Sequence, residues 1–288
     1  MIHIIVNPIA GNGMAHNVGK QLYQLLQDKR IPFSFEQTTH PGHATQIAAQ
    51  AAKKGIGTVL SVGGDGTAYE VASGLVNTDC ALGIIPAGTG NDIIKTLSFP
   101  KKPIEALETI LQGKKKKMDI GKINDQFFLN VCGTGFDVAV LENSLNAKKY
   151  VKGIFPYLYG LIKTIFTFKP INIKITIDGT LLPPEPLLLC TVANGKYIGG
   201  GIPIAPTADI HDHLLDVVIV KAVPNYKMAK YVPGLLSGKI LSFPITEHYL
   251  CTSVKIESSD MKTNIDGEII TLQGAAFELI ADALWVHY

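Results

Sequence analysis

Short apolar strand patterns alternate with helical patterns over residues 1–120, and this alternation limits the possible fold more than any other feature. The strand patterns are IHIIVN, PFSFEQ, GTVLSV and ALGIIP, and amphipathic helical patterns separate them. Strands that are joined through helices form parallel sheets. We therefore expect residues 1–120 to form an α/β domain around a parallel sheet.

After residue 120 the helical patterns thin out, and short strand patterns follow one another, several of them with Asp-Gly turns. Examples are INIKITIDG, PLLLCTVANG, LLDVVIV and MKTNIDGEII. Patterns of this kind are typical of an antiparallel sandwich, which we expect over residues 121–288. The lysine run Lys114–Lys117 lies at the boundary, and we interpret it as a solvated loop.

Composition excludes some classes of partner. The formal net charge of +2 is too small to indicate nucleic acid binding. Arg30 is the only arginine, so away from that position any phosphate must be held by backbone N–H groups, lysines or a metal ion. The 4 cysteines are far apart and predict reduced thiols in a cytoplasmic protein. We find no signal-peptide pattern and no apolar run near the ~20 residues that span a bilayer.

A glycine cluster, Gly63-Gly64-Asp65-Gly66-Thr67, directly follows the third strand pattern. Glycines there allow close approach of a ligand and turn N–H groups towards an anion, and the next helix adds its positive N-terminus. The cluster predicts a phosphate site, although a capped strand-to-helix turn is the simpler alternative. An aspartate beside phosphates requires a divalent cation or a ribose hydroxyl between them.

Two more glycine-containing loops follow strand patterns: NPIAG at Asn7–Gly11 and PAGTGND at Pro86–Asp92. Neither matches the Walker pattern or a Gly-x-Gly-x-x-Gly fingerprint, and each alone is weak. All three loops follow strands of one parallel sheet, so they must line the same edge, where ligands of such sheets bind. This convergence is the stronger signal.

These motifs, together with NIDGE far downstream, resemble the diacylglycerol kinase catalytic family, in particular its soluble bacterial lipid kinases. The likeness covers essentially the whole chain, although the GGDG motif also occurs in NAD kinases. The resemblance implies an ATP-binding α/β domain, a β-sandwich domain, and an active site in the cleft between them. It implies a kinase that uses ATP and Mg²⁺ to phosphorylate diacylglycerol or a related lipid alcohol, in phospholipid metabolism.

The resemblance also carries nucleotide-binding residues onto this chain. Thr38 matches a family position near the nucleotide, with Thr39 as the alternative if the register slips by one. The full set that it implies is Asn7, Pro8, Gly11, Thr38, Gly63, Gly64, Asp65, Gly66, Thr67, Glu70, Gly88, Thr89, Asn91 and Asp92. Asp65 and Asp92 are in addition the candidates for holding Mg²⁺.

Asp266-Gly267-Glu268 lies between two strand patterns. Position alone predicts a hairpin turn. The resemblance implies instead that this motif supplies the base that accepts the proton of the lipid hydroxyl. We favour Glu268 as the base and Asp266 as metal ligand or positioning partner, and the reverse assignment stays open.

A second acidic segment, PTADIHDHLLD, is similar to a structural Mg²⁺ loop of bacterial family members. By position, the ligands are Asp209, Asp212 and the carbonyl of Leu214. The family has glycine after the middle aspartate, whereas this chain has His213. That departure bears on the geometry of the loop. A zinc site built on the histidines has little support, because two histidines beside an aspartate are a weak pattern.

The segment from Lys148 to Lys169 combines apolar, aromatic and lysine residues. It predicts a helix with Pro156 in its first turn. This helix either packs on the sandwich or lies at an anionic membrane surface. We thus expect a cytoplasmic protein with a lipid alcohol as substrate and peripheral contact to the inner membrane face. A homodimer stays open.

Two rival functions remain at this point. An NAD kinase shares the GGDG loop and the two-domain plan, but PAGTGND and the Asp-Gly-Glu turn favour the lipid branch. A catalytically silent nucleotide- or lipid-binding protein is the rival outside the enzymes. The joint presence of Asp65, Asp266 and Glu268 argues against it.

Overall fold

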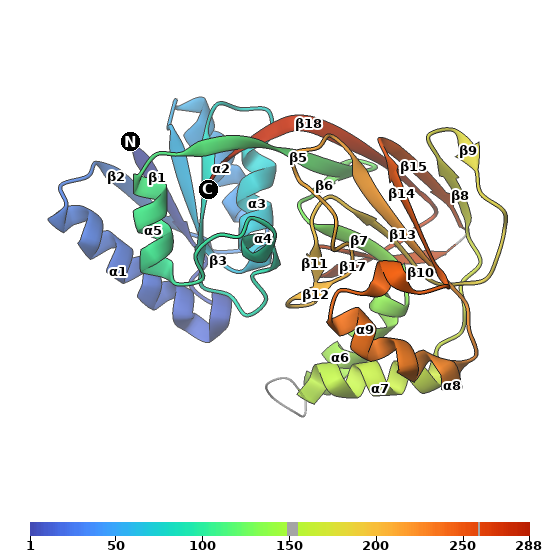
Figure 1. Ribbon diagram of the computed structural model, residues 1–288. Helices are drawn as coiled ribbons and strands as arrows, with labels where there is room; N and C mark the ends of the chain where they lie inside the picture. The colour runs from blue at the N-terminus through green and yellow to red at the C-terminus, as the bar shows by residue number, and fades with distance from the viewer. Residues whose placement is uncertain (149–154, 259) are drawn as a thin grey trace. The chain divides into compact units, whose positions relative to one another are not determined.

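The computed structural model describes residues 1–148, 155–258 and 260–288 (Figure 1). The chain forms two compact units. The first comprises residues 1–120 and 280–288, and the second comprises residues 121–279.

A parallel sheet forms the centre of the first unit. Its strands lie in the order β2-β1-β3-β4, and the end of β18 adds to β4. The strands are β1 (Ile2–Val6), β2 (Phe33–Gln37), β3 (Thr58–Gly63), β4 (Ala81–Pro86) and β18 (Ala275–His287). The residues Ile4, Ile5 and Leu60 are completely buried. Continuous apolar runs form such strands because helices cover both faces of a parallel sheet.

Helices connect these strands and cover the sheet on both sides (Figure 1). They are α1 (Met14–Asp28), α2 (His43–Lys53), α3 (Asp65–Leu75), α4 (Asp92–Thr96) and α5 (Pro103–Leu111), with a 3-10 turn at Ala10–Gly13. Helix α2 packs against α3, and α1 contacts α5. On α1 the buried residues Val18, Leu22 and Leu26 recur at helical spacing, as the sequence predicts.

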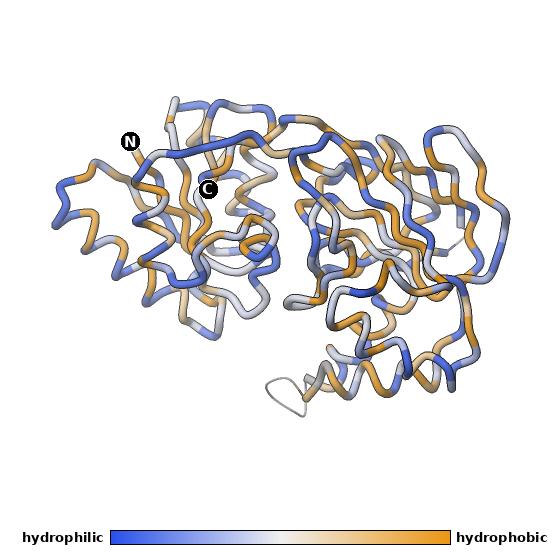
Figure 2. Tube along the Cα trace, viewed as in Figure 1, coloured by the Kyte–Doolittle hydropathy of each residue, from blue (hydrophilic) through white to orange (hydrophobic). Residues whose placement is uncertain are grey.

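Strand β5 (Lys115–Ile123) includes most of the lysine run. The interpretation of this run as a loop is therefore wrong. The Nζ atoms of Lys115 and Lys117 lie 5.0 and 5.5 Å from the centre of the Trp285 ring, so the two side chains cover that ring and form cation–π contacts. The hydrophilic start of β5 is visible in Figure 2.

The C-terminus differs from the expected division of the chain. Residues 280–288 belong to the first unit, although the sequence patterns placed them in the second. The reason is strand pairing, because Trp285 and Val286 of β18 lie parallel to Ala81 and Leu82 of β4.

The second unit is an antiparallel sandwich, as predicted. One sheet has the order β14-β13-β10-β7-β16-β17; the other contains β15, β8 and β9, with β5, β6 and the first half of β18. Their bounds are β6 (Gln126–Phe128), β7 (Val131–Gly135), β8 (Lys174–Ile177), β9 (Thr180–Leu181), β10 (Leu187–Ala193), β13 (Leu215–Lys221), β14 (Thr246–Cys251), β15 (Ser253–Glu257), β16 (Met261–Ile265) and β17 (Glu268–Leu272). Phe128, Val217, Ile256 and Phe277 are in the core between the two sheets. A short ribbon pairs β11 (Tyr197–Ile198) with β12 (Ile202–Pro203).

Helices cover the outer face of the first of these sheets. They are α6 (Phe136–Lys148), α7 (Phe155–Thr167), α8 (Asn225–Met228) and α9 (Val232–Leu236), with 3-10 turns at Ala229–Tyr231 and Ile240–Ser242. The sequence pattern predicts α7, which has Pro156 in its first turn, but α6 was not predicted. Residues 149–154 of the predicted helix lie outside the described residues.

All four cysteines are buried and unpaired, in agreement with the sequence interpretation. Among the described helices, none is long and apolar enough to cross a membrane.

Candidate active site

Three loops leave the parallel sheet at its carboxyl edge. Val6 is in register with Val62, and Gly63 is in register with Pro86, so the segments that follow begin side by side. They are the loop before α1, the turn into α3 and the loop into α4. The predicted convergence of the glycine loops is thus confirmed within the first unit.

Two pairs of these loops meet backbone to backbone. A Cβ atom on Gly88 would overlap the Cα atom of Gly64, and one on Gly11 would overlap the carbonyl oxygen of Ala87. Glycine is therefore required at Gly88 and Gly11 by contact between loops, before any ligand is considered.

Asp65 joins the second loop to the third. Its Oδ1 atom accepts hydrogen bonds from the backbone N–H groups of Asp92, at 2.6 Å, and Ile93, at 3.3 Å. These are the first N–H groups of α4, so Asp65 caps that helix. Burial, and then the nearby charge of Asp92, raise the pKa of Asp65. Two neighbouring carboxylates with this repulsion fit a divalent cation.

The N-terminus of α3 has no side-chain cap, because Gly64 occupies the N-cap position. Uncapped N–H groups and the helix dipole make such an end suited to phosphate. Helix α4 differs, since Asp65 already occupies its end. The exposed Gly66 lies in the first turn of α3, and Thr89 is exposed in the third loop.

Asn7 and Thr67 form an internal link of this edge. The Asn7 Nδ2 atom donates to Thr67 Oγ1 at 3.2 Å, and Thr67 is buried. Gly63 makes room for Thr67, because a Cβ atom on Gly63 would overlap its side chain. These contacts give both residues a structural role at the edge. Pro8, half-buried, follows Asn7, and Asn91 donates from Nδ2 to the Gly88 carbonyl at 3.0 Å.

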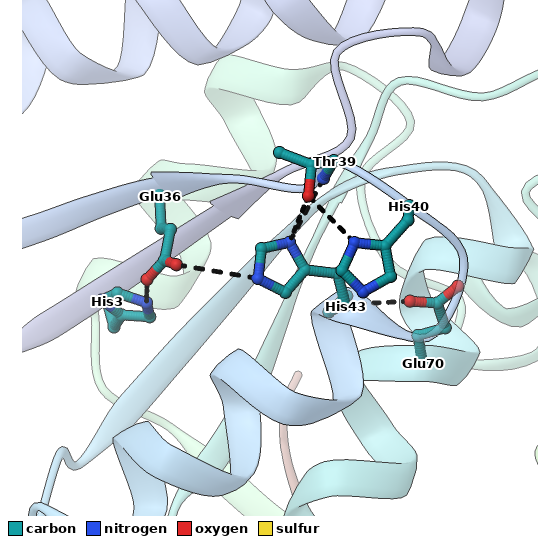
Figure 3. A network of polar contacts seen from close by, with 7 residues as sticks. His3, Glu36, Thr39, His40, His43 and Glu70 are labelled. Atoms are coloured by element: carbon teal, nitrogen blue, oxygen red, sulfur yellow. Dashed lines mark hydrogen bonds and ion pairs between the residues drawn. The ribbon is translucent and has the colours of Figure 1, made fainter.

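The segment after β2 is held by a histidine network (Figure 3). The Thr39 N–H group donates to Nδ1 of His43 at 3.2 Å, and the His40 ring stacks on His43 at 4.6 Å. Glu36 lies 4.0 Å from His43 Nε2. Thr38, one residue earlier, donates from its N–H group to the carbonyl of Val6 at 2.9 Å, which places it beside the end of β1.

Glu70 caps α2. Its Oε2 atom accepts from the N–H group of Ala44 at 3.0 Å, and the Glu70 carboxylate is seen in Figure 3. Its carbonyl accepts from the Thr45 hydroxyl at 2.9 Å. This contact joins α3 to α2, so the structure gives Glu70 a packing role in addition to the implied nucleotide contact.

In the second unit, Asp266-Gly267 is the two-residue turn between β16 and β17. Ile265 pairs with Glu268, and both turn residues have positive φ, at 46° and 102°. This geometry is that of a type I′ hairpin, which Asp-Gly favours. The hairpin interpretation is therefore correct, and it is compatible with a catalytic role for the next residue.

The Asp266 carboxylate faces its own unit. It accepts three backbone hydrogen bonds, from Leu129 at 2.6 Å, Asn130 at 3.0 Å and Val131 at 3.0 Å. A carboxylate used in this way positions the turn. Glu268 is exposed and, within the described residues, has no hydrogen bond or ion pair in its side chain. Of the two acids, Glu268 is thus the one whose carboxylate is exposed and accepts no hydrogen bond from a backbone N–H group in the part of the chain that the structure describes.

Asp209 and Asp212 lie exposed in the loop before β13. Asp209 Oδ1 accepts from the His211 N–H group at 3.1 Å, and Asp212 Oδ1 accepts from the Leu214 N–H group at 3.0 Å. His213 has φ of 63°, the left-handed conformation that a glycine would adopt there. The departure from glycine therefore leaves the turn in place. Two carboxylates and a carbonyl are ligands that Mg²⁺ takes, so this donor set fits the ion.

Two residues beside the Asp266-Gly267 turn, which we call the acidic turn, were not predicted as site residues. Asn264 precedes the turn and accepts from the Gly267 N–H group at 2.8 Å, and Asp137 contacts Asn264. The asparagine of NIDGE was visible as part of the motif. Asp137 gave no signal, because its partner is 127 residues away.

Family comparison gives two matches that together span most of the chain. Residues 1–123 match the diacylglycerol kinase catalytic domain, and residues 130–288 match the YegS C-terminal NAD kinase beta sandwich-like domain.

Individual relatives agree with these matches. A protein of Bacillus subtilis (strain 168) named "Diacylglycerol kinase" is 30% identical over 270 residues, which cover 92% of this chain and 88% of that protein. A "Probable lipid kinase YegS-like" of Chromohalobacter salexigens is 31% identical over 242 residues, or 80% of this chain and 76% of that one.

Solved structures share the fold. The crystal structure of a diacylglycerol kinase from Bacillus anthracis str. Sterne has a TM-score of 0.75 at 26% identity, covering 100% of this chain and 96% of that chain. An NAD kinase from Archaeoglobus fulgidus in complex with ATP has a TM-score of 0.57 at 12% identity, covering 100% and 94%. The second likeness concerns the fold alone.

Proposed function

The chain belongs to the family of diacylglycerol kinases and YegS-like lipid kinases, and from this premise we propose that it transfers the γ-phosphate of ATP to the hydroxyl group of diacylglycerol or a related lipid alcohol. The observation that supports the phosphate donor most directly is the uncapped N-terminus of α3, at a sheet edge where glycine loops touch. ATP phosphates would accept hydrogen bonds from these backbone N–H groups.

Asp65 and Asp92 are the residues that would hold Mg²⁺ in the first unit. When bound, the ion neutralises charge on the phosphate oxygens. The carboxylates also keep the third loop in place, since Asp65 caps α4 and Asp92 accepts from Lys95 Nζ at 2.9 Å. In the second unit, Asp209, Asp212 and the Leu214 carbonyl would hold a structural Mg²⁺.

Glu268 is the general base of this proposal. Its exposed carboxylate begins β17, directly after a turn that Asp266 fixes through three N–H groups. The base accepts the proton of the lipid hydroxyl while that oxygen attacks the γ-phosphorus, and the bond to ADP breaks. The proposal requires that this turn and the glycine loops take part in the same phosphoryl transfer.

An apolar cavity of the second unit supports a lipid acceptor. It is lined by residues of the helical layer and of the sheet beneath it, among them Phe136, Ile165, Leu188, Met228 and Phe243. The lining is almost entirely apolar, with the Tyr231 ring as part of it, so the cavity suits hydrocarbon better than the charged parts of NAD.

Helix α7 offers a route to the membrane. It packs inward through Leu161 and Ile165, so the packed interpretation holds for that side. Its outer side exposes Tyr159, Ile162 and Phe166, the last with 73% of its surface accessible. The sequence contains no acidic residue from 143 to 177 and six lysines. Apolar, aromatic and cationic side chains together favour an anionic lipid surface.

One assay separates the proposal from an NAD kinase. The protein is supplied with labelled ATP and either diacylglycerol in mixed micelles or NAD, with and without Mg²⁺. We expect label in the phosphorylated lipid only, and only with Mg²⁺. Label in NAD, or no label in any of a panel of glycerolipid, sphingoid and glycosylated lipid alcohols, would overturn the proposal.

A further inference from the structure

The buried carboxyl group of Asp137 is linked to the acidic turn through Asn264 and has no role in the proposed reaction so far. Asp137 is in the first turn of α6, and its Oδ1 atom is buried and has no hydrogen-bond partner within the described residues. Gly133 of β7 makes room for this group, because a Cβ atom there would overlap Asp137 Oδ2. Burying a carboxylate is costly, so its presence at this place calls for a function.

Asn264 connects this carboxyl group to the turn. Its side chain is buried, with Nδ2 donating to Asp137 Oδ2 at 3.3 Å and Oδ1 accepting from the Gly267 N–H group at 2.8 Å. Gly267 is the residue before Glu268. The path from the buried carboxyl group to the base therefore consists of one side-chain amide and one backbone N–H group.

We propose that Asp137 is a positioning residue, which orients the Asn264 amide and through it holds Gly267 and the carboxylate of Glu268 in the geometry of the reaction. The inference rests on the proposed function, in which Glu268 is the base. An ionised carboxylate accepts hydrogen bonds and donates none, so Asn264 must turn its NH₂ group towards Asp137. The amide oxygen then points to the Gly267 N–H group, as observed.

Protonation removes this constraint. A neutral carboxyl group both donates and accepts, so either orientation of the Asn264 amide is satisfied and the acceptor for Gly267 is no longer assured. Burial raises the pKa of Asp137 from 3.8 to about 6, against the opposing influence of the nearby Val138 N–H group and the Asn264 amide. The change of state therefore falls near pH 6.

Two thiols, a carboxylate and an ion pair lie around Asp137 on the elements packed against it. Burial raises the pKa of the Cys190 thiol to about 12 and that of Cys132 well above its usual value, so both remain neutral. Asp266 is held by its three N–H groups. An exposed ion pair between α6 and β16 joins Glu142 Oε1 to Lys262 Nζ at 2.6 Å.

The first test compares Asp137→Asn with wild type and with the exposed control Asp125→Asn. Asparagine keeps the shape but leaves both amide orientations available. We expect Asp137→Asn to lower kcat for lipid phosphorylation by about 10- to 100-fold at pH 7.5 with unchanged KM for ATP. The wild-type and control kcat should fall below pH about 6, and this fall should be absent in Asp137→Asn.

The thermal stability of Asp137→Asn distinguishes a positioning role of Asp137 from a merely structural one. Because the folded pKa exceeds the unfolded one, the contribution of Asp137 to stability is complete below pH 4 and is lost as pH rises through 6. Asp137→Asn should therefore raise Tm by about 5 °C at pH 7.5, with little change at pH 4. A variant that is more stable yet less active fits positioning. A lower Tm together with lower activity at pH 7.5 would overturn the proposal.

Amide hydrogen exchange tests the path without turnover. At pH 7.5 we expect the Gly267 N–H group to exchange at least about tenfold faster in Asp137→Asn than in wild type or Asp125→Asn, with the sheet core unchanged. Equal exchange at Gly267 would refute the inference even if the protein is a lipid kinase. If wild type phosphorylates no lipid, the proposed function fails, and the exchange result still decides whether Asp137 fixes the turn.

Discussion

Asp65 and Asp266 both belong to glycine-containing motifs, and the carboxylate of each accepts hydrogen bonds from backbone N–H groups of another segment. Asp65 caps α4, and Asp266 holds Leu129, Asn130 and Val131. Each fixes the loop that carries a proposed reactive group. Asp65 and Asp266 therefore hold backbone segments, whereas the exposed Glu268 accepts no hydrogen bond from a backbone N–H group of the described residues.

Gly88→Ala tests the contact between the glycine loops. Its Cβ atom would overlap the backbone of Gly64, which cannot give way as a side-chain end can. We expect a loss of about 1–3 kcal/mol in the free energy of unfolding. Gly66→Ala is the matched control, because nothing lies within 4 Å of its Cβ position, and helix propensity favours alanine there. Urea unfolding without nucleotide measures both, and equal losses would count against the contact.

Asp266→Asn tests the clamp on residues 129–131. Asparagine suits the turn itself but has only one oxygen to offer three N–H groups. We expect Asp266→Asn to lower the free energy of unfolding by about 2–3 kcal/mol. Asp178→Asn is the control: it is also the first residue of an Asp-Gly turn with positive φ, 43°, and it accepts from Ser253 and Thr252, but it is exposed. Asp178→Asn should lower the free energy of unfolding by less than about 1 kcal/mol. Calorimetric unfolding that gives the same loss at both positions would argue against the clamp.

Helices α6 and α7 form the element that distinguishes the second unit from a bare sandwich. They meet closely at Gly160, where a Cβ atom would overlap the Ser144 hydroxyl. The inner residues of α7 join the core beneath, and its outer residues remain exposed. One helix therefore serves both packing and, in our proposal, contact with lipid.

Ile162→Glu tests the proposed membrane contact of α7. The substitution puts a negative charge on a side chain that is 49% exposed, so folding should be unaffected, while binding to phosphatidylglycerol vesicles should weaken about tenfold or more. Leu181→Glu, on β9 and 63% exposed, provides the same change elsewhere. Co-sedimentation with vesicles measures both. The membrane role is contradicted if the two variants bind equally well.

The sequence predicted the strands of the first unit, but it did not predict helix α6 or the start of strand β5. The strands of the first unit are buried on both faces and appear as continuous apolar runs. Helix α6 was missed because it contacts α7, β7, β10 and β16, so its apolar residues do not gather on one face. The start of β5 was missed because lysines rarely mark a strand, and its partner β18 lies at the far end of the chain.

Within the candidate site, motif residues were predictable and their partners were not. The glycine loops and the acidic turn are local patterns, and the order of strands follows from the parallel sheet. The links from Asp65 to α4, from Glu70 to α2 and from Asp137 to Asn264 join residues 25 or more positions apart. Such links depend on tertiary packing, which a single sequence does not display.

At the scale of the whole molecule, two units with separate cores carry separate halves of the proposed chemistry. The first unit offers the edge where we propose that phosphate binds, and the second offers the acidic turn, the apolar cavity and the helical layer. The central claim is that both halves serve a single phosphoryl transfer. This division predicts that a substitution in the second unit can abolish phosphoryl transfer without changing the affinity for ATP.

Glu268→Gln provides the most direct measurement of this claim. ATP affinity and single-turnover transfer of labelled phosphate to diacylglycerol are measured on the same preparation. The account predicts an unchanged Kd for ATP and a loss of transfer of about 10²–10⁴-fold, because the amide cannot accept the proton of the hydroxyl. Transfer at the wild-type rate by Glu268→Gln would contradict the account.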